Sequence, residues 1–218
     1  MPTRNYILLG PPGSGKSTQA ERLKKALGLT HIDMGSALRA AAREDTPFGH
    51  ELNEIINQRH ELVSDEIMER VLIQAIERAP ENTGVLIDGT PRRASQIDAV
   101  IRVLQDSGRA IKGVIFISLS EQEAVERISK RYLCRNCLQP YILGKDFFSP
   151  TEVCSVCGGE IAQRADDTPE GIRTRYQIFH SETLPVIEHF EKMHLLLRID
   201  GDQEADATFQ SIIDQLDK

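Results

Sequence analysis

The sequence has 218 residues, of which 40% are hydrophobic, 27% charged and 5% aromatic. This length fits one domain of ordinary size with inserted subdomains, and the composition excludes a disordered chain, a collagen and a disulfide-rich miniprotein. With 33 acidic and 26 basic residues, the formal net charge of −7 argues against a general nucleic-acid-binding role. The apolar runs are too short to span a membrane, and the N-terminus lacks a signal-peptide pattern, so we expect a cytoplasmic enzyme.

Short apolar runs alternate along the chain with amphipathic segments. Strands are expected at residues 6–9, 85–88, 113–119 and 195–199. Helices are expected at residues 16–27, after Ser64, before Gly108, after Ser120 and near the C-terminus up to Leu216. This alternation predicts an α/β fold with a parallel sheet between layers of helices.

A glycine-rich segment joins the first expected strand to the first expected helix. Residues 10–17 read Gly-Pro-Pro-Gly-Ser-Gly-Lys-Ser, a complete P-loop motif in its strand–loop–helix context. The glycines let backbone N–H groups turn toward phosphates at the N-terminus of the helix. Lys16 is expected to reach the β- and γ-phosphates, and the Ser17 hydroxyl to contact Mg²⁺. The context disfavours the alternative, a structural turn that binds no nucleotide.

Asp88 is a candidate for the metal that accompanies the nucleotide. It ends the second expected strand and precedes Gly89-Thr90-Pro91-Arg92. An acid at such a strand end can hold the water ligands of Mg²⁺ in a P-loop enzyme. The alternative is a carboxylate that only caps a turn.

Several arginines are candidates for phosphate binding. A single arginine is usually part of the solvated surface, but guanidinium groups also suit phosphate oxygens and the charge of a transferring phosphoryl group. Arg131 and Arg164 bracket the cysteine-containing segment, where a hinged lid could bring them onto phosphate. The full set is Arg39, Arg92, Arg127, Arg131, Arg164, Arg173 and Arg175.

All four cysteines fall into two C-x2-C pairs, Cys134 with Cys137 and Cys154 with Cys157. This spacing is typical of a tetrathiolate zinc site. Disulfides are disfavoured in the reducing cytosol, and the remaining alternative is a set of free or redox-active thiols. We therefore expect a metal-stabilised insertion at about residues 134–159.

These motifs, in this order, resemble those of the adenylate kinase family of nucleoside monophosphate kinases, in its long form with a zinc-binding lid. The resemblance extends from Tyr6 to about Leu216. Besides the P-loop, Asp88 and the cysteines, it rests on Gly35 with Leu38-Arg39-Ala40, Leu62-Val63-Ser64-Asp65-Glu66, Gln96, Arg127-Ile128, Arg131 and Gln163-Arg164-Ala165-Asp166-Asp167 followed by Arg173 and Arg175.

The resemblance implies a P-loop NTPase-type three-layer fold with two inserted subdomains. The expected core comprises residues 1–33, 64–129 and 168–218, with a monophosphate-binding subdomain at 34–63 and a zinc-binding lid at 130–167. The implied activity is reversible phosphoryl transfer from Mg·ATP to a nucleoside monophosphate, with AMP as the expected acceptor. These nucleotides are the expected partners of a monomer that binds neither nucleic acid nor membrane.

The resemblance also implies roles for individual positions. Those implied for ATP are Gly13, Ser14, Gly15, Lys16, Ser17, Thr18, Arg127, Arg131, Pro140, Tyr141 and Gln203. Those implied for the acceptor are Met34, Arg39, Glu61, Leu62, Val63, Gly89, Thr90, Pro91, Arg92, Gln96, Arg164 and Arg175. The implied catalytic residues are Lys16, Arg92, Arg131, Arg164 and Arg175, with Ser17 and Asp88 for Mg²⁺ and the four cysteines for structural Zn²⁺. Asp166 and Asp167 match acids of the lid hinge and are expected to order arginines by ion pairs.

The sequence departs from the family pattern mainly around the acceptor. The usual Ser-Thr-Gly-Asp is here Asp33-Met34-Gly35-Ser36, so the threonine that commonly contacts the acceptor base is a methionine. The usual Asp-Gly-Phe-Pro-Arg has Thr90 in place of phenylalanine, and Tyr132 replaces an arginine often found beside Arg131. Two alternatives therefore stay open: a P-loop kinase with another monophosphate or a small metabolite as acceptor, and a nucleotide-dependent zinc-knuckle binding protein.

Overall fold

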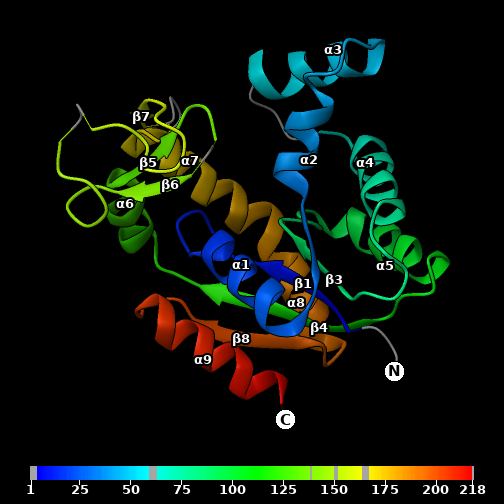
Figure 1. The fold of residues 1–218 in the computed structure, drawn as a ribbon. Coiled ribbons are helices and arrows are strands. Elements are labelled where there is room, and N and C mark those ends of the chain that lie inside the picture. The colour runs from blue at the N-terminus through cyan, green and yellow to red at the C-terminus, as the bar shows by residue number, and fades with distance from the viewer. Residues whose placement is uncertain (1–3, 59–62, 138, 150–151, 164–166, 218) are drawn as a thin grey trace.

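The computed structural model describes residues 4–58, 63–137, 139–149, 152–163 and 167–217. Five parallel strands form the central sheet in the order β2-β3-β1-β4-β8 (Figure 1). Their bounds are Asn5–Leu9 for β1, Thr30–Asp33 for β2, Val85–Asp88 for β3, Ile111–Ser118 for β4 and Leu196–Asp200 for β8. The predicted parallel sheet is confirmed. The sequence did not reveal β2, because its polar residues interrupt the apolar run that marks the other strands.

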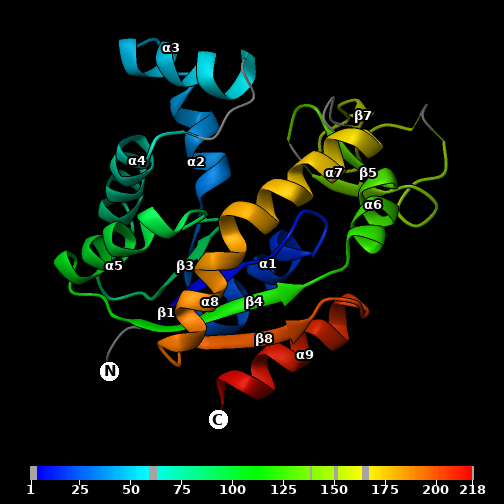
Figure 2. The same ribbon diagram turned by 180° about the vertical axis from the view of Figure 1, so that it is seen from behind.

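Alternate side chains of the central strands enter two hydrophobic cores on opposite faces of the sheet. In β1, Ile7 and Leu9 enter one core, whereas Tyr6 and Leu8 enter the other. The helices of the first face are α4 (Asp65–Glu77), α5 (Ile97–Asp106) and α8 (Leu184–Lys192), and those of the second are α1 (Lys16–Leu27) and α9 (Ala205–Leu216) (Figure 2). The expected three-layer arrangement is confirmed.

Short-range sequence signals fix the ends of several helices. Gly28, with φ of 65°, ends α1 in the left-handed conformation predicted for it. The Ser64 hydroxyl accepts a hydrogen bond from the N–H of Ile67 and caps α4. Ser120 caps α6 (Glu121–Ser129) in the same way, through the N–H of Glu123. These cap positions confirm three of the predicted helix boundaries.

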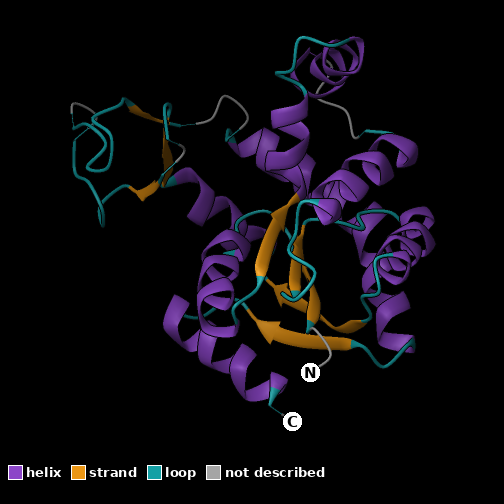
Figure 3. Cartoon of the chain, turned by 45° about the vertical axis from the view of Figure 1, so that its right-hand side comes forward, coloured by secondary structure: helices purple, strands orange, loops and turns teal. Residues whose placement is uncertain are grey.

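Two smaller parts extend from the core (Figures 1 and 3). One contains α2 (Met34–Ala41), α3 (Pro47–Asn53) and a π-helical turn, η1 (Glu54–Gln58). The other is an antiparallel sheet in the order β6-β5-β7, formed by Arg131–Cys134, Pro140–Ile142 and Ile161–Ala162 as β5, β6 and β7. Both interrupt the βα alternation of the core.

A continuous helical path connects the second of these parts to the core. It consists of α7 (Pro169–Ile178), a π-helical turn η3 (Phe179–Thr183) and α8, which follow one another along the face of the sheet in Figure 2. A short 3-10 turn, η2 (Ala94–Gln96), precedes α5. Within the described ranges, none of the helices is both long and apolar enough to cross a bilayer.

Candidate active site

The P-loop connects β1 to α1. Gly13 and Gly15 have φ of 80° and 83°, which favours glycine at both positions. A Cβ atom on Gly13 would also lie 3.2 Å from the Cα of Ala124 in α6. The loop therefore needs its glycines for backbone conformation and close packing, and it places the N-terminus of α1 at the carboxyl edge of the sheet. Helix N-termini at such an edge are suited to phosphate binding.

Lys16, the first residue of α1, folds back over the loop. Its Nζ donates hydrogen bonds to the carbonyl oxygens of Gly10 at 2.6 Å and Pro11 at 3.0 Å. Burial is the main cause that lowers the pKa of Lys16 to about 8; the charge of Asp88 opposes this shift, and those of Arg92 and Arg131 add to it. A bound phosphate would supply the negative charge that favours the ammonium form.

Asp88 is buried at the end of β3, beside a histidine that the sequence analysis did not identify. His31 Nε2 lies 3.5 Å from Asp88 Oδ2, and His31 Nδ1 lies 3.5 Å from Glu21 Oε1. Burial acts to lower the pKa of His31, but Asp88, Asp33 and Glu21 together raise it above its ordinary value. The pairing of β2 with β3 brings the two side chains together. A histidine on a short polar strand gave no periodic signal by which to find it.

Arg131 and Arg175 converge on Asp167, whose side chain is fully buried. Arg131 donates from Nε and Nη2 to the carboxylate at 2.7–3.1 Å, and Arg175 Nη2 donates to it at 2.8 Å. This arrangement confirms the predicted ion pairs for Asp167. Asp166 and Arg164, for which similar ion pairs are expected, lie outside the described residues.

The segment after β8 is joined to α6 through Arg127. Its Nη1 donates to the carbonyl oxygen of Gly201 at 2.8 Å, and its Nη2 lies 3.5 Å from Asp202 Oδ1. Gln203 belongs to the same loop, and its side chain donates to the carbonyl oxygen of Asp200. Arg127 thus lies close to the loop that carries Gln203. Both residues are expected to contact ATP.

Pro140 and Tyr141, also expected to contact ATP, differ from each other in exposure. Pro140 is exposed on β6, whereas the Tyr141 ring is buried in the small hydrophobic core that contains Cys134 and Cys154. The Tyr141 hydroxyl donates to Cys154 Sγ at 3.2 Å and accepts from the N–H of Ser155 at 3.0 Å. The Tyr141 side chain therefore contacts the cysteine cluster, so we expect its backbone to make the predicted contact with the nucleotide.

Most of the residues expected to bind the acceptor line a single pocket of about 130 Å³. The lining residues are Met34, Gly35, Leu38, Arg39, Ile56, Val63, Met68, Gly89, Thr90, Arg92 and Gln96. Pro91 is not among them, and Glu61 and Leu62 lie outside the described residues. A larger pocket of about 470 Å³ between α3 and α4 contains none of the predicted site residues.

At the start of α2, Asp33 and Ser36 stand where the family pattern has serine and aspartate. Hydrogen bonds between the two side chains compensate for this exchange. Asp33 caps the helix by accepting from the N–H of Ser36, and the Ser36 hydroxyl also donates to Asp33. The same hydroxyl accepts from Arg39 Nη2 at 3.0 Å. Burial acts to raise the pKa of Asp33, but the Ser36 hydrogen bonds and the charge of Arg39 hold it below its ordinary value. The carboxylate thus caps the N-terminus of α2 and orients Arg39 through Ser36.

Gln96 holds the backbone beside Arg92 through hydrogen bonds. Its Oε1 accepts from the N–H of Arg92 at 2.8 Å and of Arg93 at 3.3 Å, and its Nε2 donates to Asp65 Oδ1 at 2.9 Å. The carbonyl oxygen of Arg92 accepts from the Thr183 hydroxyl at 3.0 Å. Arg92 is therefore held by its backbone from both sides. The contact of Gln96 with Asp65 could not be found from sequence, because the two residues are 31 positions apart.

The four cysteine sulfurs lie within 4.8 Å of one another. The Sγ atoms of Cys134 and Cys157 are 3.4 Å apart, and those of Cys137 and Cys154 are 3.5 Å apart. Four thiolates about 2.3 Å from a tetrahedral zinc ion would have sulfurs about 3.8 Å apart, so the cluster fits this ion. The Tyr141 hydroxyl is the main cause that lowers the pKa of Cys154 to about 6, which favours the ligating thiolate form.

The fold and this edge of the sheet define a P-loop nucleotide-binding protein with a separate pocket lined by Arg39 and Arg92. A sequence model described as adenylate kinase matches residues 8–195. The chain is 37% identical to an adenylate kinase of Carboxydothermus hydrogenoformans, over 97% of this chain and 99% of that protein. It is 37% identical to an adenylate kinase of Pyrococcus abyssi, over 98% and 96% of the two chains, and 35% identical to one of Thermosipho melanesiensis, over 96% and 97%. The chain belongs to the adenylate kinase family.

Proposed function

We propose that the protein transfers the terminal phosphoryl group of ATP to the phosphate of AMP, forming two molecules of ADP. The observation that carries this proposal is the convergence of the P-loop, Asp88, Arg92 and Arg131 around Lys16, next to a pocket that contains Arg39. A P-loop and an arginine-containing pocket near the same edge of the sheet support transfer between two bound nucleotides. Family membership supports the same reaction.

The acceptor phosphate is expected to lie between Arg39 and Arg92. Both line the pocket, and guanidinium groups can donate paired hydrogen bonds to phosphate oxygens. Ser36 orients Arg39, while Gln96 and Thr183 hold the backbone of Arg92. Such prior positioning lowers the entropic cost of bringing the two reactants together.

In the transfer step, an oxygen of the AMP phosphate attacks the γ-phosphorus of ATP. The bond between that phosphorus and the bridging oxygen breaks, and the bridging oxygen leaves with ADP. The attacking oxygen is already anionic near neutral pH, so the step needs no general base. Lys16, Arg131 and Arg175 would stabilise the charge on the transferring group, and Asp167 would hold the two arginines in place. Arg164 is proposed for the same role on the resemblance alone.

Mg²⁺ bound with ATP neutralises phosphate charge and orients the phosphates. The Ser17 hydroxyl and Asp88 carboxylate are oxygen donors of the type that Mg²⁺ prefers, and we assign its site to them. Four thiolates leave no open coordination position for a substrate, so zinc would have a structural role in the lid. The grouping of all four cysteines at one candidate metal site, rather than in disulfides, also supports a cytoplasmic location.

We further propose that residues 34–63 and 130–167 move as subdomains on a core formed by 1–33, 64–129 and 168–218. Closure of the first over the acceptor and of the second over ATP would exclude water from the transferring group. The extension of α2–η1 and β5–β7 away from the central sheet supports this division (Figure 1).

The test is an acceptor panel with purified protein, Mg·ATP and AMP, dAMP, CMP, UMP or GMP. We expect ADP formation with AMP at least about tenfold faster than with the pyrimidine nucleotides. A preference for another monophosphate would correct the acceptor. ATP turnover only with a non-nucleotide acceptor would overturn the proposal, as would nucleotide binding without any transfer.

A further inference from the structure

Arg93 contacts the wall of the acceptor pocket, although it does not line the pocket itself. Its Nη1 donates to the carbonyl oxygen of Val63 at 3.1 Å. Val63 lines the pocket and is buried among apolar residues of the core. The hydrogen bond therefore fixes the backbone at one side of the pocket by means of a residue that lies outside it.

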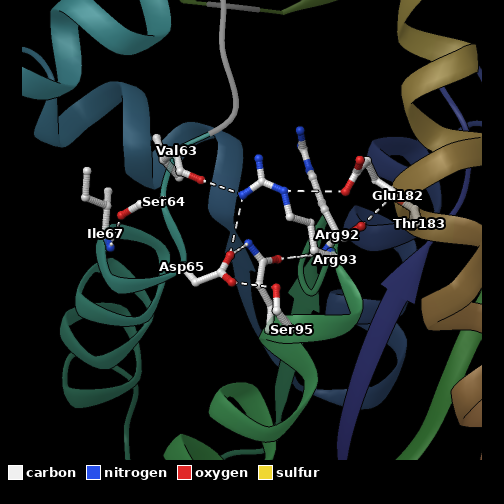
Figure 4. Close-up of polar contacts among 10 residues, drawn as sticks. Val63, Ser64, Asp65, Ile67, Arg92, Arg93, Ser95, Glu182 and Thr183 are labelled. Atoms are coloured by element: carbon white, nitrogen blue, oxygen red, sulfur yellow. Dashed lines mark hydrogen bonds and ion pairs between the residues drawn. The ribbon is translucent and has the colours of Figure 1, made fainter.

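The same guanidinium group connects its own segment to two others, residues 63–65 and η3 (Figure 4). Besides Val63, its Nη1 lies 3.5 Å from Asp65 Oδ1 at the start of α4, and its Nε lies 3.6 Å from Glu182 Oε2 in η3. The Arg93 side chain is 29% exposed, so solvent weakens these two ion pairs and their contribution to stability is small. Their effect is to hold the guanidinium group in the position from which it reaches Val63.

The backbone of Arg93 is in turn fixed to that of Arg92. Gln96 Oε1 accepts from the N–H groups of both residues, and Thr183 donates to the carbonyl oxygen of Arg92. Arg92 and Val63 both line the pocket but belong to different parts of the chain. Arg92 follows β3, whereas Val63 precedes α4. Arg93 thus connects two parts of the pocket wall that come from separate stretches of the chain.

We propose that Arg93 is a positioning residue for the acceptor, which holds the Val63 segment at a fixed place relative to Arg92. This inference rests on the proposed function. Arg93 is not among the residues that line the pocket, and it acts through Val63 and Arg92. None of its partners belongs to the P-loop, so its removal affects the acceptor and not ATP.

The test compares Arg93→Met with the control Arg102→Met. Arg102 Nη2 lies 2.6 Å from Glu69 Oε1, so it also joins α5 to α4, but neither residue lines the pocket. For Arg93→Met we expect the KM for AMP to rise about tenfold, with the KM for ATP and kcat within about twofold of wild type. Tenfold corresponds to ~1.4 kcal/mol, within the range for a hydrogen bond from a charged donor. Arg102→Met is expected to change none of the three values by more than about twofold.

Arg93→Lys keeps the charge but cannot reach Val63, Asp65 and Glu182 at once, so its KM for AMP should fall between those of wild type and Arg93→Met. An unchanged KM for AMP in Arg93→Met, an equal rise in both KM values, or an equal effect of Arg102→Met would each overturn the inference. If wild type forms no ADP from ATP and AMP, it is the proposed function that fails. Titration calorimetry with AMP alone still tests Arg93 in that case, with an expected tenfold weaker Kd for Arg93→Met and an equal Kd contradicting it.

Discussion

Burial and the charges of Arg92 and Arg131 disfavour the charged form of the Lys16 side chain, whereas the charges of Asp88 and Asp33 favour it. The loop carbonyls of Gly10 and Pro11 hold it in the absence of phosphate. Because its pKa in the folded protein is lowered to about 8, the charged form costs stability below that pH. This cost is relieved as the pH rises from about 8 toward the unfolded value of about 10.4.

We predict that kcat/KM for ATP decreases above an apparent pKa of about 8, because the free protein loses the Lys16 charge there. Lys16→Arg should lack this decrease, since a guanidinium group stays protonated. Lys16→Met should lower kcat about a hundredfold or more, yet leave the melting temperature at pH 7 equal to or above that of wild type. Steady-state rates from pH 6 to 10 and thermal melts provide the measurement. A kcat for Lys16→Met above a tenth of wild type would refute the assigned role.

Thr90 gives a second prediction at this scale. Its hydroxyl is buried and has no hydrogen-bond partner among the described residues. Replacing such a group with an apolar one of similar shape removes the free-energy cost of burying a polar group without a hydrogen-bond partner. Thr90→Val should therefore leave the free energy of unfolding unchanged or raise it by up to about 2 kcal/mol, and Thr90→Ala should be less stable than Thr90→Val by about 1–2 kcal/mol, because it lacks the methyl groups. Urea unfolding of the nucleotide-free variants tests this, and a loss for Thr90→Val as large as that for Thr90→Ala would contradict it.

Residues that carry their chemistry in a local motif could be predicted from the sequence. Lys16, Asp88 and the four cysteines stand at fixed spacings or at the end of an apolar strand, and the structure places them accordingly. Their supporting partners could not be predicted. Asp65 meets Gln96 across 31 residues, and Thr183 meets Arg92 across 91, so only the folded chain brings them together.

At the scale of elements, the predicted strands and helices follow from apolar periodicity and capping residues. The final amphipathic helix appears as α9, and the strand predicted at 113–119 appears as β4 at Ile111–Ser118. The π-helical turn η3 was not predicted, because π-helices have no distinct apolar period. Yet η3 carries Thr183 and Glu182, which contact Arg92 and Arg93.

The junction between the lid and α7 depends on Asp167. Asp167→Ala would leave Arg131 and Arg175, each 27% exposed, without their shared buried carboxylate. We expect this change to lower the free energy of unfolding by about 2–4 kcal/mol, a range that allows for partial solvation of the arginines. Asp167→Asn should lower it less, because the amide oxygen still accepts hydrogen bonds. Urea unfolding checks both, and a change below about 0.5 kcal/mol in Asp167→Ala would show that the arginines need no anchor.

The cysteine cluster makes a prediction about the lid. The purified protein should contain one zinc ion per chain, and its removal by a chelator should lower the melting temperature by about 5 °C or more, since the ion binds only the folded site. Cys154→Ser should melt at the temperature of the chelated protein and respond little to further chelation. Metal analysis with thermal melts gives the result. Zinc-free protein whose melting is unaffected by chelation would contradict this assignment.

At the scale of the whole molecule, the two smaller parts are inserted after different kinds of element, one after a strand and one after a helix. One begins directly after β2, and the other follows α6 and returns through α7 (Figure 1). Four strands of the central sheet, β1, β3, β4 and β8, could be predicted from sequence, whereas β2, α7 and α8 could not. The shapes of the two insertions could not, because short helices and two- to four-residue strands give weak periodic signals.

The most direct test of the central claim is the stoichiometry of nucleotide conversion by the purified protein. With Mg·ATP and AMP present together, we predict that two ADP molecules form for each ATP consumed, with one AMP lost and no inorganic phosphate released. With ATP alone, no ADP should form. Formation of ADP with release of phosphate, independent of AMP, would identify a nucleotide hydrolase and contradict transfer between the two sites.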